Sequence, residues 1–182
     1  MGLSLVKDVP KYFSQLVIMN TGLPTGNDWR EMKSLSHVQR VLPFCLWRAF
    51  VSLFATLLPV EFIFKRIVGC SDEIAKAYNA PFPSSEYKGG VAQWPLLVPL
   101  FIDDPVAHHM AQATAFLSTC KKPALVMFGD SDPITKGIDK TFLRMMPHAK
   151  HVTIKGASHF LQETHGPELS ENIISFLSKD SI

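Results

Sequence analysis

The chain has 182 residues, of which 47% are hydrophobic and 19% charged, and its formal net charge is +2. This composition is typical of a globular domain with a hydrophobic core and excludes an intrinsically disordered protein. Lys and Arg are scattered along the chain, so neither their number nor their distribution indicates nucleic-acid binding.

The first residues predict the tail of a helix followed by a short strand. Apolar side chains recur from Leu3 onward, and Pro10 is expected to end the helix. Residues 16–19 form a short apolar run of the kind found in strands that are buried on both faces. A turn-rich segment, residues 20–26, follows this run. We therefore assign residues 1–22 to one piece of an α/β core.

Residues 23–115 predict a separate helical domain, because they contain no convincing strand and prolines separate several helical segments. The stretch 41–64 is mostly apolar, but charges interrupt it and prolines bracket a segment that is too short to cross a membrane. We expect no membrane span here and interpret the stretch as a cap helix over an apolar pocket. The charges and prolines are Arg48, Glu61, Pro43 and Pro59.

Strands and helices alternate again in residues 116–182. Strands are predicted at 124–128 and 151–154, with a helix near 138–146 between them. A helical insertion between two stretches of strand–helix alternation is typical of a cap on a parallel sheet. The fold class is therefore α/β, with three parallel core strands. The final helix is expected to bury Leu169, Ile173, Ile174, Phe176 and Leu177.

One histidine and one aspartate follow successive strands in this last part. His159 comes shortly after the strand that ends at Ile154, and Asp130 and Asp132 come directly after the preceding strand. An acid and then a histidine on successive strand ends is typical of an α/β-hydrolase, where the histidine is the general base. We favour Asp132 as its partner, because the following Pro133 holds the chain extended, whereas Asp130 is suited to capping the turn. A purely structural histidine is the alternative.

Five segments in order along the chain resemble haloalkane dehalogenases, and most closely the subfamily whose acid follows the penultimate strand. The resemblance implies the C-terminal portion of an α/β-hydrolase fold with a helical cap. It also implies hydrolysis of a carbon–halogen bond without cofactor or metal, with His159 as base and Asp132 orienting it. The segments are Asn20-Thr21-Gly22-Leu23-Pro24-Thr25-Gly26, Tyr78-Asn79-Ala80-Pro81-Phe82-Pro83, Val98-Pro99 with Asp103-Asp104-Pro105, Gly129-Asp130-Ser131-Asp132-Pro133-Ile134 and Ala157-Ser158-His159-Phe160-Leu161-Gln162-Glu163.

The same resemblance implies ligand contacts in the helical domain. Trp47 resembles the cap tryptophan that donates its indole N–H to the leaving halide, a group that donates and cannot accept. Trp94, Pro95 and Val98 match a stretch that lines the substrate pocket. The implied ligands are a small apolar haloalkane and a halide ion. Simple packing of the cap is the alternative for both tryptophans.

The chain departs from the family at its start. The family's nucleophile lies in Asp-Trp-Gly-Gly, and Gly2-Leu3 resembles the Gly-Leu that follows this motif, so neither the nucleophile nor the oxyanion loop occurs in these 182 residues. We expect the chain to be inactive alone. An epoxide hydrolase, which uses two cap tyrosines, and a non-catalytic interaction module are the alternatives.

The cysteines and the first residues bear on location. Cys45, Cys70 and Cys120 show no metal-ligand spacing, and the N-terminus shows no signal-peptide pattern. An odd cysteine count without such a signal predicts reduced thiols and a cytoplasmic protein. The sequence leaves the oligomeric state open.

Overall fold

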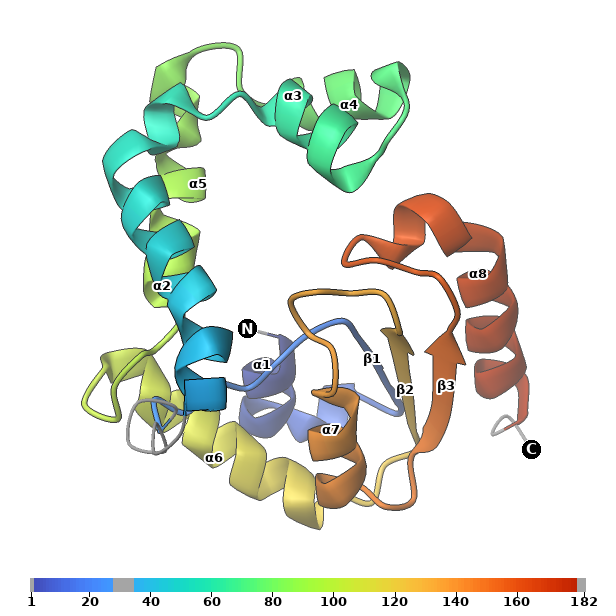
Figure 1. Ribbon diagram of the computed structural model, residues 1–182. Helices are drawn as coiled ribbons and strands as arrows, with labels where there is room; N and C mark the ends of the chain where they lie inside the picture. Colours follow the sequence, from blue (N-terminus) through green and yellow to red (C-terminus); the bar gives the residue numbers. More distant parts are fainter. Residues whose placement is uncertain (1, 28–34, 180–182) are drawn as a thin grey trace. The chain divides into compact units, whose positions relative to one another are not determined.

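The computed structural model of the chain describes residues 2–27 and 35–179. The chain divides into two compact units, one formed by Met1–Leu23 together with Met110–Ile182 and the other by Pro24–His109. We call the first the sheet unit, because it contains every strand of the described chain, and the second the helical unit (Figure 1). Each unit is described by itself.

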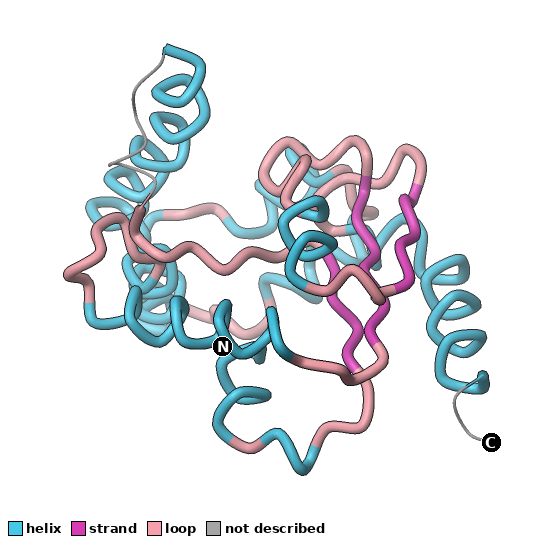
Figure 2. The backbone as a smooth tube through the Cα atoms, turned by 90° about the horizontal axis from the view of Figure 1, so that it is seen from below, coloured by secondary structure: helices cyan, strands magenta, loops and turns pink. Residues whose placement is uncertain are grey.

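The sheet unit is built on three parallel strands in the order β1-β2-β3. They are β1 (Leu16–Met19), β2 (Ala124–Gly129) and β3 (Lys150–Ile154), and all three lie side by side in Figure 2. Every residue of the central strand β2 is buried, as expected for a continuous apolar run in a parallel sheet. The prediction of a partial α/β fold with three parallel core strands is confirmed.

Alternate residues of β2 face opposite sides of the sheet, and each side has its own hydrophobic core. Val126 and Phe128 lie in one core, and Leu125 and Met127 lie in the other. The first core is closed by α1 (Gly2–Asp8), α6 (Pro105–Thr119) and α7 (Asp139–Met145), the second by α8 (Leu161–Lys179). The buried helix residues are Val6, Leu117, Phe142, Leu161, Leu169 and Phe176.

The last helix differs from its prediction in its buried face. It begins at Leu161, and its backbone leaves helical geometry at His165, two residues before Pro167. The expected core residues Leu169 and Phe176 are buried and Ile173 is partly buried, but Ile174 is 63% exposed and Leu177 is exposed as well. Residues 169, 173 and 176 share one helix face, whereas 174 and 177 lie on its flank.

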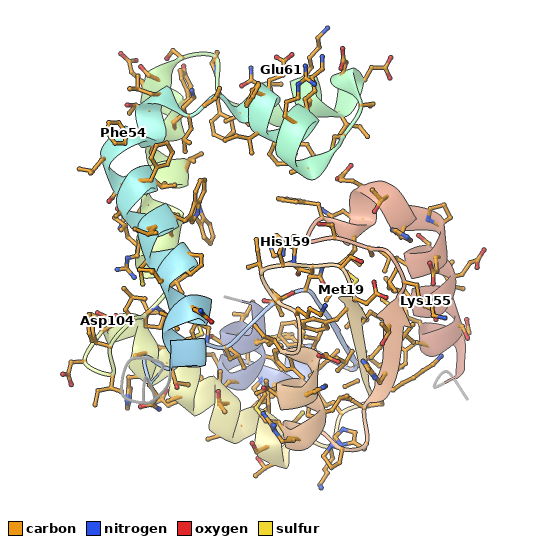
Figure 3. The ribbon with its side chains drawn as sticks, in the orientation of Figure 1. Met19, Phe54, Glu61, Asp104, Lys155 and His159 are labelled. Carbon is orange, nitrogen blue, oxygen red and sulfur yellow. The ribbon has the colours of Figure 1, made fainter. Side chains whose placement is uncertain are left out.

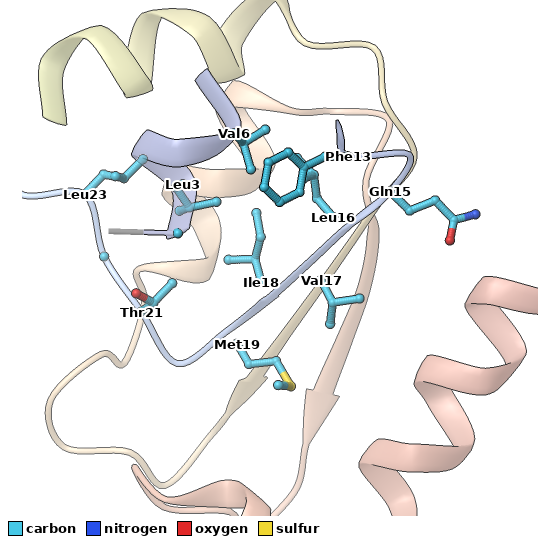
Figure 4. A pocket seen from close by; sticks show the side chains of 12 residues that line it. Leu3, Val6, Phe13, Gln15, Leu16, Val17, Ile18, Met19, Thr21 and Leu23 are labelled. Carbon is cyan, nitrogen blue, oxygen red and sulfur yellow. The ribbon is translucent and has the colours of Figure 1, made fainter. Parts of the chain in front are cut away.

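The outer edge of β1 is open in the described chain. The amide of Leu16 donates to Pro123 O at 2.9 Å, so Leu16 and Ile18 bond toward β2 while Val17 and Met19 direct their backbone groups away from it. A groove of ≈ 420 Å³ runs along this edge between β1 and α1 (Figure 4). The edge therefore offers both backbone hydrogen-bonding groups and an apolar surface.

In the helical unit, α5 (Gly89–Gln93) and the short 3₁₀ helix η5 (Trp94–Leu97) pack on the long helix α2 (Leu35–Phe54), while α3 (Val60–Ile63), the π-helix η3 (Phe64–Val68) and α4 (Asp72–Asn79) pack on one another. Pro43 was expected to mark one end of the apolar segment. It lies inside α2 instead, and the helix continues through it. Val51, Ala55 and Leu58 form the core of the unit. No helix in the described residues has the length and apolar character needed to cross a membrane. The short 3₁₀ helices η2 (Ala55–Leu57) and η4 (Ser85–Lys88) complete the helical unit. One more 3₁₀ helix, η1 (Pro10–Tyr12), belongs to the sheet unit.

Candidate functional site

The chain leaves β2 and β3 at the same end of the sheet, where His159 lies in Figure 3. Two backbone bonds join the exits, Asp130 N–H to Ile154 O and Ser131 N–H to Ala157 O, both at 3.2 Å. Gly129 is required at this crossing, because a Cβ there would lie 2.2 Å from Ala157 O. The close approach brings the loop after β2 against the loop after β3.

Asp132 and His159 meet in this contact. The Nδ1 atom of His159 lies 3.0 Å from Oδ2 of Asp132. The Asp132 side chain is 0% exposed, whereas that of His159 is 30% exposed. The carboxylate also accepts the amide N–H of Ile134 at 2.8 Å and the hydroxyl of Thr135. A buried carboxylate is tolerable when its oxygens have such donors, and these hold it in a single orientation toward the imidazole.

The protonation state of Asp132 determines how the histidine is held. Burial by itself would raise the pKa of Asp132, but hydrogen bonds from Thr135, His159 and Ile134 outweigh it and lower the pKa below its ordinary value. An ionised carboxylate can only accept hydrogen bonds, so His159 Nδ1 carries the proton in this pair. The Nε2 atom of the neutral ring then keeps its lone pair, which is the arrangement of a general base.

Asp130 occupies a different position from Asp132. It is exposed, and its Oδ1 accepts the Gly156 amide at 2.7 Å and the Ser131 hydroxyl at 3.0 Å. The bond from Gly156 is the main reason why the pKa of Asp130 is lowered. Gly156 has a φ of 74°, a left-handed conformation that suits glycine. The structure thus places Asp130 in the turn and brings only Asp132 to the histidine.

The sequence reasoning did not single out Asn20 or Thr135. Asn20 directly follows β1, and its amide bonds both to the end of β2 and to the loop that carries His159. Thr135 is buried and donates to Asp132. An Asn at a strand end ahead of turn residues is a detectable signal for a capping role, but the partners of Asn20 lie more than 100 positions away.

The predicted ligand residues of the helical unit lie on two of its elements. Trp47 is on α2, is 43% exposed, and its ring centroid lies 6.2 Å from that of Phe50. Trp94 and Pro95 begin η5, and Trp94 is 55% exposed. Arg48 Nη1 donates to Val98 O at 2.6 Å and joins α2 to the end of η5. The structure therefore holds both predicted segments in one packed unit.

Within residues 2–27 and 35–179, no three His, Cys, Asp or Glu side chains gather in a way that could hold a metal ion.

Known proteins similar to this chain are haloalkane dehalogenases. One from Psychrobacter cryohalolentis is 35% identical over 184 residues, and one from Mycolicibacterium paratuberculosis is 34% identical over 182 residues. These alignments cover 97% and 96% of the chain and 56% of each relative, so the chain spans about half the length of the curated relatives it matches. No protein-family model matches the chain.

A solved structure agrees with this relationship. The haloalkane dehalogenase DpaA from Paraglaciecola agarilytica superposes with a TM-score of 0.76 at 27% identity, over 94% of this chain and 55% of DpaA. The sequence and the fold point to the same relatives, and both match over nearly the whole chain. Sequence and fold together therefore support this chain as the C-terminal portion of a haloalkane dehalogenase, with part of an α/β-hydrolase fold.

Proposed function

We propose that this chain supplies the general base of a haloalkane dehalogenase, and that His159 and Asp132 carry this role. The observation that supports the proposal is the 3.0 Å contact between His159 Nδ1 and the buried carboxylate of Asp132. That contact fixes the ring and leaves Nε2 as the basic nitrogen. The His159 side chain is 30% exposed, so water can reach the ring.

The reaction proceeds in two displacements. A carboxylate first attacks the carbon that bears the halogen, which forms an alkyl ester and releases halide. Nε2 of His159 then takes a proton from water, the hydroxide adds to the ester carbonyl, and the alcohol leaves with that proton. Asp132 stabilises the imidazolium formed in the second step. No Asp-Trp-Gly-Gly motif for the first step occurs in the 182 residues, so we expect the chain to lack activity alone.

We assign the remaining family roles to the helical unit as a cap domain. Trp47 is the proposed halide donor, because its indole N–H can only donate and the side chain is partly exposed. Trp94, Pro95 and Val98 are the proposed pocket wall for a small apolar haloalkane. The odd number of cysteines supports a cytoplasmic location.

The epoxide hydrolase alternative depends on two cap tyrosines, Tyr78 and Tyr87. The ring of Tyr78 is stacked on Phe64 with centroids 3.8 Å apart and planes at 13°. Tyr87 is exposed and lies in a different element, η4. These positions do not favour a tyrosine pair, and the dehalogenase relatives support the main proposal.

The test compares two proteins. The first is the 182-residue chain, and the second is a joined enzyme in which the N-terminal portion of the Psychrobacter cryohalolentis relative precedes Gly2. We expect halide release from 1-haloalkanes by the joined enzyme and none by the chain alone. His159→Ala in the joined enzyme is the control for the base. A joined enzyme that folds but releases no halide would contradict the proposal, as would release by the chain alone above the rate of its own His159→Ala variant.

A further inference from the structure

The side-chain amide of Asn20 forms hydrogen bonds through both its oxygen and its nitrogen, and these bonds join three segments of the sheet unit. Its Oδ1 accepts the Gly129 amide at 3.0 Å, and its Nδ2 donates to Ser158 O and to His159 O, both at 2.9 Å. The partners lie 109, 138 and 139 positions away in the sequence. We propose that Asn20 is a positioning residue that holds the backbone of His159 so that the imidazole reaches Asp132.

These side-chain bonds lie just past the last paired residues of the sheet. The pairing of β1 with β2 stops at Met19 and Met127, and the pairing of β2 with β3 stops at Gly129 and Ile154. Past these residues the chains run into loops, and two backbone bonds still join the loops after β2 and β3. The Asn20 amide links the end of β1 to the end of β2 and to the histidine loop with three bonds, and a strand end that needed only a cap would require one.

The backbone of Asn20 is also unusual. Its φ is 32°, and it is the one non-glycine residue with positive φ in the described chain. Asparagine tolerates this region better than most residues, but the conformation still costs free energy. Such strain persists where surrounding contacts over-determine it, and here the contacts are those that the amide makes with Gly129 and with the histidine loop.

The loop that carries His159 is held at consecutive residues by different partners. Asp130 Oδ1 accepts the Gly156 amide, Ser131 N–H donates to Ala157 O, and Asn20 donates to the two carbonyls that flank the Cα from which the imidazole branches. The Asn20 bonds lie nearest to the ring. A shift of about 1 Å at such a position can reduce turnover about 100-fold, because the reacting groups lose their alignment.

The first test separates the two halves of the amide. Asn20→Asp can still accept the Gly129 amide but cannot donate to the two carbonyls. In the 182-residue chain labelled with ¹⁵N-histidine and ¹⁵N-glycine, we expect the His159 Nδ1 proton to exchange with water about tenfold faster, because the loop that carries the ring loses both bonds that Asn20 donates to it. Gly129 amide exchange should stay within a small factor of the wild-type rate. Asn172→Asp removes an equivalent amide bond to Glu168 O on α8 and should change neither rate.

The second test is kinetic and rests on the proposed function. Asn20→Gly in the joined enzyme removes the amide, and glycine accepts the positive φ without strain. We expect kcat to fall about 100-fold and KM to fall with it, so that kcat/KM stays nearly unchanged, because the base acts only after the alkyl ester has formed. Should Asn20→Asp fail to fold, Asn20→Gly takes its place in the exchange measurement.

The outcomes distinguish the two proposals. Wild-type exchange of the Nδ1 proton, or full turnover of Asn20→Gly, would mean that Asn20 only caps the strand end, and the inference would be wrong. Faster Nδ1 exchange in a joined enzyme that never releases halide would support the positioning role and would contradict the proposed function.

Discussion

The sheet unit and the helical unit differ in how they hold the residues assigned to chemistry. In the sheet unit, polar bonds that span 27 to 139 positions fix His159, Asp132 and Asn20. In the helical unit, Trp47 and Trp94 are exposed, and neighbouring apolar side chains on α2 are exposed too. The difference teaches that polar contacts hold the proposed base in place, whereas the proposed ligand residues Trp47 and Trp94 lie on an exposed surface; the bond from Arg48 to Val98 O spans 50 positions but involves neither tryptophan side chain.

The largest expected effect concerns the two aspartates at the end of β2. In the joined enzyme, Asp132→Asn should lower turnover by about 10⁴, because an amide favours the wrong imidazole tautomer. Asp130→Asn is the matched control and should cost less than about tenfold, since Asp130 only caps the turn at Gly156. Steady-state halide release measures both. Equal losses would show that the 3.0 Å contact of Asp132 with His159 is not what orients the base.

A glycine substitution tests how tightly the sheet unit is built. Gly129→Ala places a Cβ 2.2 Å from Ala157 O, and we expect it to destabilise the sheet unit by about 3 kcal/mol. Gly89→Ala in the helical unit meets nothing within 4 Å and should be neutral or stabilising by about 0.5 kcal/mol. Denaturant unfolding followed at separate probes in the two units decides the point. A neutral Gly129→Ala would mean that the two loops are free to move apart.

The pH dependence of stability follows from the lowered pKa of Asp132. As the pH falls, the unfolded chain takes up the proton first, so the stabilisation by the ionised carboxylate is present above about pH 4 and is lost below it. Thr135→Val removes one donor, raises the pKa toward its ordinary value and should cost about 1 kcal/mol near neutral pH, with a shallower acid limb.

Thr114→Val is the control for this experiment, since the Thr114 hydroxyl donates to Met110 O within α6, away from Asp132. Carboxyl ¹³C titration of Asp132 reports the pKa itself. An Asp132 pKa that does not move in Thr135→Val would remove the physical basis of the prediction.

The smallest effect is expected on the exposed face of α2. Leu53 is 75% exposed, so Leu53→Ala should change the free energy of unfolding by less than about 0.5 kcal/mol. The same substitution at Leu117, which is fully buried in the sheet unit, should cost about 3 kcal/mol. A large loss at Leu53 would reveal a packing role that the structure of the helical unit does not show.

Local patterns predicted the fold well and the site in part. The apolar run of β2 and the order of Asp132 and His159 after successive strands are visible in the sequence, and the structure places these two side chains in contact. The preference for Asp132 over Asp130 came from the neighbouring Pro133. Their catalytic roles stay predictions.

The part of the site that the sequence did not predict depends on contacts between residues far apart in the chain. Asn20 cannot be assigned a function from its neighbours, because its bonds reach Gly129 and His159, which only the assembled sheet brings near. The predicted buried face of α8 is too wide, because it includes every apolar residue of the helix, although helical spacing places Ile174 and Leu177 on the flank of the face that is buried.

The central claim is that His159 is the base for the second half of the reaction, and one measurement tests it directly. In the joined enzyme, His159→Ala should release one equivalent of halide and then stop, and intact-protein mass spectrometry should show the mass of one added alkyl group. Sustained turnover by this variant, or the absence of both the burst and the alkyl adduct in a folded protein, would contradict the assignment of His159.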